Sequence, residues 1–370
     1  MSVLLTGGTG YLGGYALTEW MRTRPEDVIA LVRAPDRETA VGRLWHGVQL
    51  HVDRATFASW LPRIDIALGD LHGPGLGLDD ATRDRVMATA TSVLHIAASL
   101  NRRSEKACLN TNLRGTLTVV ELARTLAEKG RLRRYTHVST VAVAGERSCE
   151  VVQEDTAIDW DRSDYDPYGR TKKFAEHLAE TLLAGCDPVF LRPSIVLGDS
   201  RRPETTQFDM VRAFCGLASA RFVPLKAETR LDIVAADWVG EAIVAIHGAP
   251  KLEHRRFHLA SGVHSPTGAS IAAALAEAGQ RLTFLPWLAP TFATAIRAGL
   301  ALPRGWRMRD AAVLMDVFWP YITYDTVFAN DRATAVVGRP PPRFEARAAS
   351  LMAWAVRNRF RYPHKSWEPM

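Results

Sequence analysis

A tyrosine and a lysine stand four positions apart in the stretch "DPYGRTKKFAE", as Tyr168 and Lys172. This spacing places both side chains on one face of a helix, one turn apart. Asp166 and Pro167 suit the cap and the first turn of that helix. A free phenol has a pKa of about 10, so we expect the Lys172 ammonium to lower the pKa of Tyr168. The pair then predicts acid–base catalysis near neutral pH, with lysine donors left for a nicotinamide ribose.

Other polar residues follow buried stretches of the chain. Ser139 and Thr140 end the stretch "YTHVST", where a hydroxyl can polarise a substrate carbonyl. Asn110 and Asn112 lie at a helix start in "NTNLRGT", where capping explains an asparagine as well as catalysis does. His95 in "LHIAAS" is expected to be a packed histidine at a strand end. The histidines have no metal-ligand spacing, so we predict no metal site.

The chain opens with an apolar strand and a glycine-rich turn, "LLTGGTGYLGG". Gly7, Gly10 and Gly13 form a G-x-x-G-x-x-G pattern, and Gly8 with the last two forms G-x-G-x-x-G. The turn lies between a predicted strand and a predicted helix, which is the setting of a dinucleotide-binding turn. Backbone N–H groups at such a helix start bind a phosphate anion. The pattern therefore predicts a dinucleotide site.

The end of the second predicted strand indicates which dinucleotide binds. Enzymes that use NAD usually place Asp or Glu about 20 residues beyond the glycine turn. Here Arg33 stands at that position, in "ALVRAPDRETAVGRL", and Arg43 follows ten residues later. A guanidinium suits a 2′-phosphate because it forms two parallel charged hydrogen bonds. Asp70 in "GDL" can accept from an adenine amino group, although a turn explains it equally well. We predict NADPH as the cofactor.

The first half of the chain alternates predicted strands and helices. The strands are short and rich in Val, Ile and Leu, which is typical of parallel strands covered by helices on both faces. The Tyr168–Lys172 pair follows the fifth of these strands. This position makes the pair a more specific signal of catalysis than its spacing alone would be. The pattern predicts an α/β fold, a Rossmann-type doubly wound parallel sheet. The predicted strands lie at 3–5, 27–33, 64–70, 92–99, 135–143 and 187–193.

The alternation of predicted strands and helices changes after Gly198. A polar loop and a helix are followed by a strand–helix unit at 230–249, and from Ser265 the chain reads mostly as helices interrupted by prolines. We expect an NADP-binding Rossmann-like domain over 1–262, to which 198–230 adds part of a substrate lobe. The rest of that smaller, mostly helical lobe is expected at 263–370, with a substrate cleft between the two.

One apolar stretch, residues 284–303, is about long enough to cross a bilayer. Pro286 and Pro290 interrupt its beginning, however, and Arg297 lies inside it. These residues argue against a membrane span. They favour a buried helix or a lid helix. Contact with a membrane surface and an apolar wall of the substrate pocket are the alternatives.

The composition is that of a soluble globular enzyme. Of 370 residues, 47% are hydrophobic and 23% charged, and the net charge of +6 suits phosphates or an acidic carrier protein. A solvated surface explains that charge equally well, and no basic run with interleaved aromatics suggests nucleic acid. No signal peptide is predicted. Four cysteines without metal or redox spacing are expected to be reduced structural thiols of a cytoplasmic protein, namely Cys108, Cys149, Cys186 and Cys215.

These motifs together resemble the extended short-chain dehydrogenase/reductase superfamily over about the first 260 residues. Within it, "LVRAPDRETAVGRL", "HVSTVAVAG" and "RPSIVLG" resemble the thioester reductase and fatty acyl-CoA reductase branch. The later stretch "FWPYITYDTVFANDRATAVVG" resembles the tail of fatty acyl reductases more loosely. The motifs occur in the superfamily's order, as "TGGTGYLG", "GDL", "HIAA", "NLRGT", "VSTVAVAG", "YGRTK" and "LRPSIVLG".

The resemblance implies roles for particular residues. Tyr168 would be the acid/base, Lys172 its partner and Asn112 a proton-relay residue. Thr140 would be the catalytic hydroxyl, because it lies five residues before Gly145. Members of this branch deliver hydride from NADPH to an acyl thioester on CoA or on a carrier protein, giving an aldehyde or, after a second hydride, an alcohol. The implied cofactor contacts are Gly7, Thr9, Gly10, Tyr11, Leu12, Gly13, Arg33, Arg43, Asp70, Leu71, Ala97, Ser139, Lys172, Pro193, Ser194 and Val196.

Three other functions stay open at this point. An NADPH-dependent ketone or aldehyde reductase, of the dihydroflavonol-reductase or hydroxysteroid-dehydrogenase kind, would carry the same Tyr, Lys and Thr, and differs by releasing no thiol from acyl-CoA. A sugar-nucleotide epimerase usually has an acidic residue where Arg33 stands. A non-catalytic NADP-binding protein is expected to lack the Tyr–Lys pair, and both residues are present here.

Overall fold

Seven parallel strands form the central sheet of the computed structural model, which describes residues 2–368. Each strand is short, and β5 and β7 are buried along their whole length. The strand order reverses between β1 and β4, so the first four strands confirm the predicted doubly wound topology. The order across the sheet is β3 (Ile64–Leu68), β2 (Asp27–Val32), β1 (Ser2–Thr6), β4 (Ala90–His95), β5 (Arg134–Val138), β7 (Val189–Pro193) and β11 (Arg256–Leu259).

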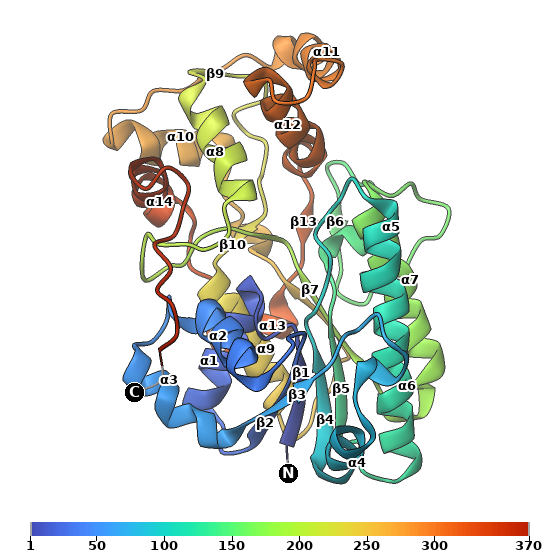
Figure 1. Cartoon of the computed structure of the whole chain (residues 1–370). Helices are drawn as coiled ribbons and strands as arrows, with labels where there is room; N and C mark the ends of the chain where they lie inside the picture. Colours follow the sequence, from blue (N-terminus) through green and yellow to red (C-terminus); the bar gives the residue numbers. More distant parts are fainter. Residues whose placement is uncertain (1, 369–370) are drawn as a thin grey trace.

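Helices cover both faces of this sheet, as Figure 1 shows. Apolar side chains of these helices pack toward the strands, which buries the sheet on both sides. One face carries α1 (Tyr11–Thr23), α2 (Arg37–Val48), α3 (Arg54–Trp60), α9 (Ala236–Gly248) and α13 (Asp331–Val337). The opposite face carries α4 (Asp80–Thr89), α6 (Gly115–Glu128) and α7 (Pro167–Leu182).

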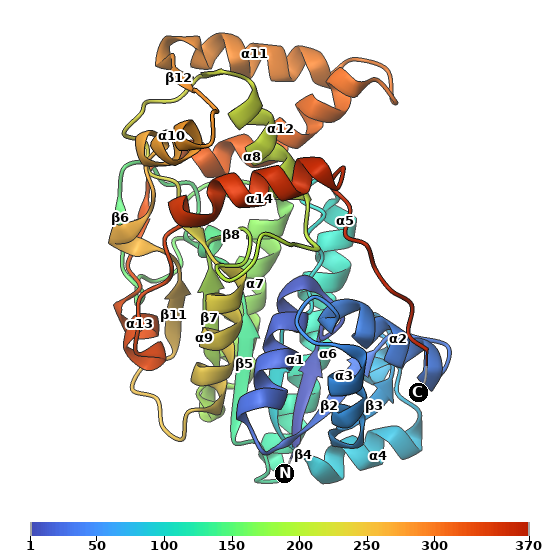
Figure 2. The same ribbon diagram turned by 90° about the vertical axis from the view of Figure 1, so that its left-hand side faces the viewer.

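A helical lobe lies beyond the carboxyl ends of the strands (Figures 1 and 2). It has a hydrophobic core of its own, to which Val211, Leu275, Tyr321 and Leu351 contribute. Three two-stranded parallel pairs connect this region: β8 (Ile195–Val196) with β10 (Ile233–Val234), β6 (Val151–Val152) with β13 (Val327–Phe328), and β9 (Phe222–Val223) with β12 (Thr283–Phe284). The lobe helices are α8 (Asp209–Ser219), α10 (Gly268–Glu277), α11 (Ala289–Leu300), α12 (Arg307–Thr323) and α14 (Glu345–Arg357).

The apolar stretch 284–303 contains α11, which pairs with α12 as a helical hairpin. Ile296 is the residue of α11 that is buried, so this helix covers the lobe from outside and is not a core helix. Within residues 2–368, no helix is long and apolar enough to cross a membrane. Close packing of the hairpin depends on Gly299, because a Cβ there would lie 2.5 Å from the Cβ of Ala312.

The last described residues return from the lobe to the nucleotide-binding half (Figure 1). We call residues 358–368 the C-terminal strap. The Trp367 ring lies 5.1 Å from the ring of Phe57 and 5.8 Å from that of Trp45, and Trp45 Nε1 donates to the carbonyl of Lys365 at 2.9 Å. The strap thereby ties α14 to α2 and α3. Since α13 also packs on α9, the chain crosses between the halves more than once after residue 262.

The thiols are free and occupy different environments. Cys108 and Cys215 are buried, Cys186 is partly exposed and Cys149 is exposed. A structural role in the core therefore suits Cys108 and Cys215, whereas Cys149 lies at the surface.

Candidate active site

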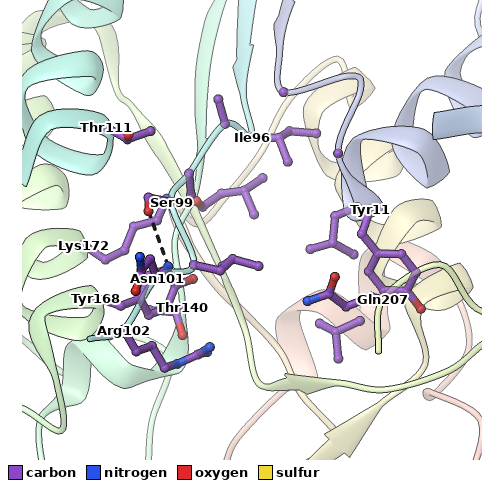
Figure 3. Close-up of a pocket in the computed structure, with 18 of the residues that line it drawn as sticks. Tyr11, Ile96, Ser99, Asn101, Arg102, Thr111, Thr140, Tyr168, Lys172 and Gln207 are labelled. Carbon is purple, nitrogen blue, oxygen red and sulfur yellow. Dashed lines mark hydrogen bonds between the residues drawn. The ribbon is translucent and has the colours of Figure 1, made fainter. Parts of the chain in front are cut away.

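A cavity of about 1020 Å³ opens between the sheet and the lobe. The carboxyl ends of β1, β4, β5 and β7 form its floor, and α12 forms an opposite wall. Figure 3 shows Tyr168, Thr140 and Lys172 on one side and Tyr11 and Gln207 on the other. Every residue that the sequence predicts as a cofactor contact lines it: Gly7, Thr9, Gly10, Tyr11, Leu12, Gly13, Arg33, Arg43, Asp70, Leu71, Ala97, Ser139, Lys172, Pro193, Ser194 and Val196.

The glycine turn is built by close backbone contacts. Gly7 adopts a φ of +79°, and a Cβ there would lie 2.6 Å from the amide nitrogen of Ala97. A Cβ on Gly13 would lie 1.9 Å from the carbonyl oxygen of Gly7. α1 begins at Tyr11, and its N-cap residue, Gly10, has no side chain that could accept from the first N–H groups of the helix. These N–H groups are therefore free to bind an anion. The turn fits a dinucleotide phosphate.

Changing Gly13 to Ala is expected to weaken binding of a nicotinamide dinucleotide by about 100-fold. The added Cβ collides with the Gly7 carbonyl, so the turn must move, and the loss of two charge-assisted hydrogen bonds costs about 3 kcal/mol. Gly8→Ala is the matched control, because its Cβ meets the side chain of Leu5 at 3.1 Å rather than backbone. Fluorescence titration with NADPH measures both variants, and equal affinities for them would contradict this account of the turn.

Arg33 and Arg43 lie together at the far end of the glycine turn. The Arg43 guanidinium donates to the Arg33 carbonyl, and Arg33 Nη1 lies 3.8 Å from Asp70 Oδ2. The Arg33 side chain is 68% exposed, so its guanidinium is accessible to a ligand. Asp70 also holds the β3 turn, because its Oδ1 accepts from the His72 amide at 3.0 Å. This corner of the cavity combines two cations with one carboxylate.

The catalytic helix α7 begins as the sequence predicts. The Asp166 side chain accepts from the Gly169 amide at 2.8 Å, and Pro167 occupies the first turn. Tyr168 is 7% exposed and Lys172 1% exposed, although both line the cavity. Lys172 Nζ donates to the Val138 carbonyl at 2.7 Å. The start of the helix therefore places the phenol and the amine at the end of β5.

The predicted lowering of the Tyr168 pKa is wrong for this structure. Burial raises the pKa of Tyr168 and outweighs the guanidinium of Arg102, which lowers it. Burial also lowers the pKa of Lys172 to about 7, so this amine is a weaker cation than an exposed lysine. Both residues of the pair line the cavity, but their spacing does not reveal their burial, which governs their charge.

Ser139 and Thr140 end β5 beside this pair. The Ser139 hydroxyl is buried at the cavity wall and finds no hydrogen-bond partner in the described part of the chain. The Thr140 hydroxyl accepts from the Ala142 amide at 3.3 Å and lies 3.5 Å from the Pro193 carbonyl. An unsatisfied buried hydroxyl is unfavourable, so Ser139 fits a wall that contacts a polar ligand.

Asn112 lies behind the cavity rather than on its surface. It is fully buried in a π-helical turn, Leu109–Arg114. Its Oδ1 accepts from the Ser99 amide at 2.7 Å, and its Nδ2 donates to the Ser99 carbonyl at 3.1 Å and to the Thr171 hydroxyl at 3.2 Å. Asn112 thus joins the loop after β4 to α7. A proton-relay role stays a prediction.

His95 is a packed residue at the end of β4. Its ring nitrogens lie 2.6 Å from the Thr6 hydroxyl and 3.0 Å from the Thr116 hydroxyl. Burial lowers the pKa of His95 to about 3, so the ring is neutral at physiological pH. Across residues 2–368, no group of His, Cys, Asp and Glu is arranged to hold a metal ion.

Sequence reasoning missed the residues that close the cavity above Tyr168. Arg102 lies in the loop after β4, and Phe318 and Tyr321 lie on α12; all of them line the cavity. The adjacent basic residues in "NRRSEK" directly after a strand were a usable signal for Arg102. The α12 residues gave none, because their place beside the sheet depends on the lobe.

The family described as male sterility protein matches residues 5–243 of the chain, about two thirds of its length. The chain belongs to this family. It is the thioester reductase family of the extended short-chain dehydrogenase/reductase superfamily, and this reductase is therefore an NAD(P)-binding oxidoreductase.

The regions of its relatives that match the reductase are parts of larger proteins. The nonribosomal peptide synthetase asaC of Aspergillus flavus is 29% identical over 269 residues, which are 70% of this chain and 26% of asaC. The carboxylic acid reductase of Mycobacterium tuberculosis is 28% identical over 282 residues, 66% of this chain and 23% of that protein. The fatty acyl-CoA reductase wat of Drosophila melanogaster is 27% identical over 243 residues, 58% of this chain and 46% of wat. The reductase thus spans about a quarter of the first two relatives.

Solved structures share the fold of the reductase. The terminal R domain from the myxalamid PKS-NRPS pathway superposes with a TM-score of 0.82 at 22% identity, covering 97% of this chain and 91% of that one. A thiolation-reductase di-domain from an archaeal non-ribosomal peptide synthetase gives 0.76 at 16% identity, covering 97% and 76%. The lobe is included in both, since nearly the whole chain is covered.

Proposed function

We propose that the protein is an NADPH-dependent reductase of acyl thioesters, producing an aldehyde and, after a second round, an alcohol. One observation carries the proposal: a single cavity joins the dinucleotide turn and its two arginines to Tyr168, Thr140 and an apolar wall. Membership of the thioester reductase family supports a thioester as the substrate class.

The chain's own residues act on the carbonyl oxygen. Bound reduced nicotinamide supplies hydride for the carbonyl carbon. Thr140 and Tyr168 donate hydrogen bonds to the oxygen and stabilise its negative charge as that charge develops. Tyr168 then gives up its proton to the oxygen, and the hemithioacetal releases thiol to leave the aldehyde. Lys172 is held by the Val138 carbonyl with further donors free for a ribose.

Residues on the lobe side of the cavity suit an acyl chain. Val313, Leu314, Val317 and Phe318 present an apolar surface from α12, and Met210 adds to it from α8. The thioester carbonyl would lie where this wall meets Tyr168. One structural neighbour is a thiolation-reductase di-domain of a non-ribosomal peptide synthetase, which favours a carrier protein as the acyl donor, with CoA as the alternative.

Arg33→Ala is expected to raise the KM for NADPH about 10- to 100-fold and to leave the KM for NADH nearly unchanged. A guanidinium–phosphate interaction contributes about 1.5–3 kcal/mol, and NADH lacks the 2′-phosphate. Arg37→Ala removes an equal charge from the exposed start of α2, outside the cavity, and serves as the control. Steady-state kinetics with both coenzymes measure the effect, and an equal loss with NADH would refute the phosphate assignment.

The proposed function is tested by following NADPH oxidation against a panel of acyl-CoAs and acyl-loaded carrier proteins. Thiol release is measured in parallel, and the products are identified by mass spectrometry. Aldehyde formed with stoichiometric thiol supports the proposal, and alcohol with two NADPH consumed per thiol shows a second round. Reduction of ketones or free aldehydes without any thioester activity would establish the alternative reductase instead.

A further inference from the structure

Arg102 places its guanidinium among the aromatic rings above the active site. Its Cζ lies 4.8 Å from the centre of the Tyr168 ring, 5.1 Å from that of Tyr321 and 5.4 Å from that of Phe318. Its side chain is 19% exposed. A cation this near a ring, and largely withdrawn from water, interacts more strongly than a surface charge does.

The Asp166 carboxylate lies beside the Arg102 cation and also accepts a hydrogen bond from α12 of the lobe. Arg102 Nε lies 3.4 Å from Asp166 Oδ2, and the Tyr321 hydroxyl donates to the same oxygen at 2.7 Å. The other oxygen, Asp166 Oδ1, caps α7 through the Gly169 amide. Arg102 Nε has no hydrogen-bond partner in the described chain, so Asp166 attracts the guanidinium through charge, and the ring of Tyr321 on α12 lies against it. Figure 3 shows it beside Tyr168 and Thr140.

We propose that Arg102 is a positioning residue for the reduction: it is the cation that orients the Tyr168 phenol and stabilises its negative charge, whereas the neighbouring Asp166 carboxylate acts in the opposite direction. This inference rests on the proposed role of Tyr168 as the acid. Lys172 lies one helical turn beyond Tyr168, where its Nζ donates to the Val138 carbonyl and lies 3.4 Å from His137 Nε2.

The charges around Tyr168 act in opposite directions. After burial, which raises the pKa of Tyr168, Arg102 lowers it most, and Asp166 raises it. A hydrogen bond with Thr140 lowers the pKa, and Cys108 raises it. Two further titratable groups lie nearby: Lys172 one turn along the same helix, and Tyr321 on α12, which bonds the Asp166 carboxylate.

This arrangement predicts charge-specific shifts. Arg102→Gln removes the cation, so the midpoint of Tyr168 ionisation rises by about one pH unit. Asp166→Asn keeps a good helix cap but removes the anion, so the midpoint falls. Arg102→Lys retains the charge and stays close to the parent protein. If Arg102 and Asp166 only packed α12 against the sheet, their variants would not shift the midpoint of Tyr168 ionisation in opposite directions.

The experiment is an ultraviolet titration of phenolate absorbance in the full chain without substrate, with Tyr168→Phe subtracted to isolate Tyr168. Arg114→Gln is the control for lost charge, because Arg114 is exposed and bonds Asn110 away from the cavity. A raised midpoint for Arg102→Gln and a lowered one for Asp166→Asn support the proposal. Unchanged midpoints, or shifts of one sign in both, overturn it. If Arg102→Gln does not fold, Asp166→Asn and Arg102→Lys still decide the outcome.

Kinetics separate this inference from the proposed function. With whichever carbonyl substrate the parent protein reduces, the alkaline limb of kcat moves up in Arg102→Gln, because the acid must be protonated, and kcat falls about ten-fold. Absence of thioester reduction in the parent protein refutes the proposed function alone, since the titration requires no substrate.

Discussion

Tyr168→Phe is expected to lower kcat for the thioester by about 10³-fold while the Kd for NADPH stays unchanged. In the proposed mechanism the Tyr168 hydroxyl donates to the developing oxyanion and supplies its proton, and such a group contributes about 10²- to 10⁴-fold. The ring remains, so its contacts with Arg102 and the packing of α7 are preserved. Single-turnover kinetics and NADPH fluorescence titration measure the two quantities separately.

A matched variant shows whether the hydroxyl or the packing is responsible. Tyr165→Phe alters a neighbouring tyrosine whose hydroxyl accepts from the Arg147 amide at 2.9 Å, outside the cavity lining of the described chain. We expect this variant to keep nearly full activity. A Tyr168→Phe protein that turns over at the parent rate would remove Tyr168 from the mechanism.

Arg192→Met is expected to destabilise the protein by about 3–5 kcal/mol. The Arg192 side chain is 3% exposed and pairs with Glu176, which is 2% exposed. Nε lies 3.0 and 3.2 Å from the two carboxylate oxygens, and Nη2 lies 2.6 Å from Oε2. Removing the arginine leaves a buried carboxylate without its cation. The pair joins α7 to β7, so the loss also loosens the helix that carries Tyr168 and Lys172.

Urea unfolding of three variants tests this account. The double variant Arg192→Met/Glu176→Leu is expected to recover most of the loss, because replacing a buried ion pair by apolar groups is often neutral. Arg256→Met removes a cation from a more exposed pair with Glu180, which also links β11 to α7, and is expected to cost less than about 1 kcal/mol. Similar costs for Arg192→Met and Arg256→Met would show that burial of the pair does not matter.

Much of the fold and of the cofactor site follows from local sequence. Short Val- and Ile-rich strands, the glycine turn and the Asp166–Pro167 helix start each carry a signal within a few residues. The predicted cofactor contacts lie together because the carboxyl ends of parallel strands meet at one edge of the sheet. The positions of Arg33 and Arg43 at one end of the cavity follow from strand β2 and helix α2 and do not depend on how the lobe packs.

The parts that the sequence could not supply depend on distant segments. Asp166 and Tyr321 are 155 positions apart, and nothing in either segment indicates that they share a hydrogen bond. The charge of Lys172 depends on burial beneath β5, which the i, i+4 spacing does not reveal. The role of Asn112 is similarly hidden, because its partners Ser99 and Thr171 come from a loop and another helix. Packing decides these features, not periodicity.

The C-terminal strap makes an early part of the chain depend on a segment that is synthesised much later. Domains generally fold from the N-terminus as the ribosome releases them. Trp45 and Phe57 emerge long before Trp367, which packs against both rings in the finished protein. The packing around Trp45 and Phe57 is therefore completed only after the strap has been synthesised.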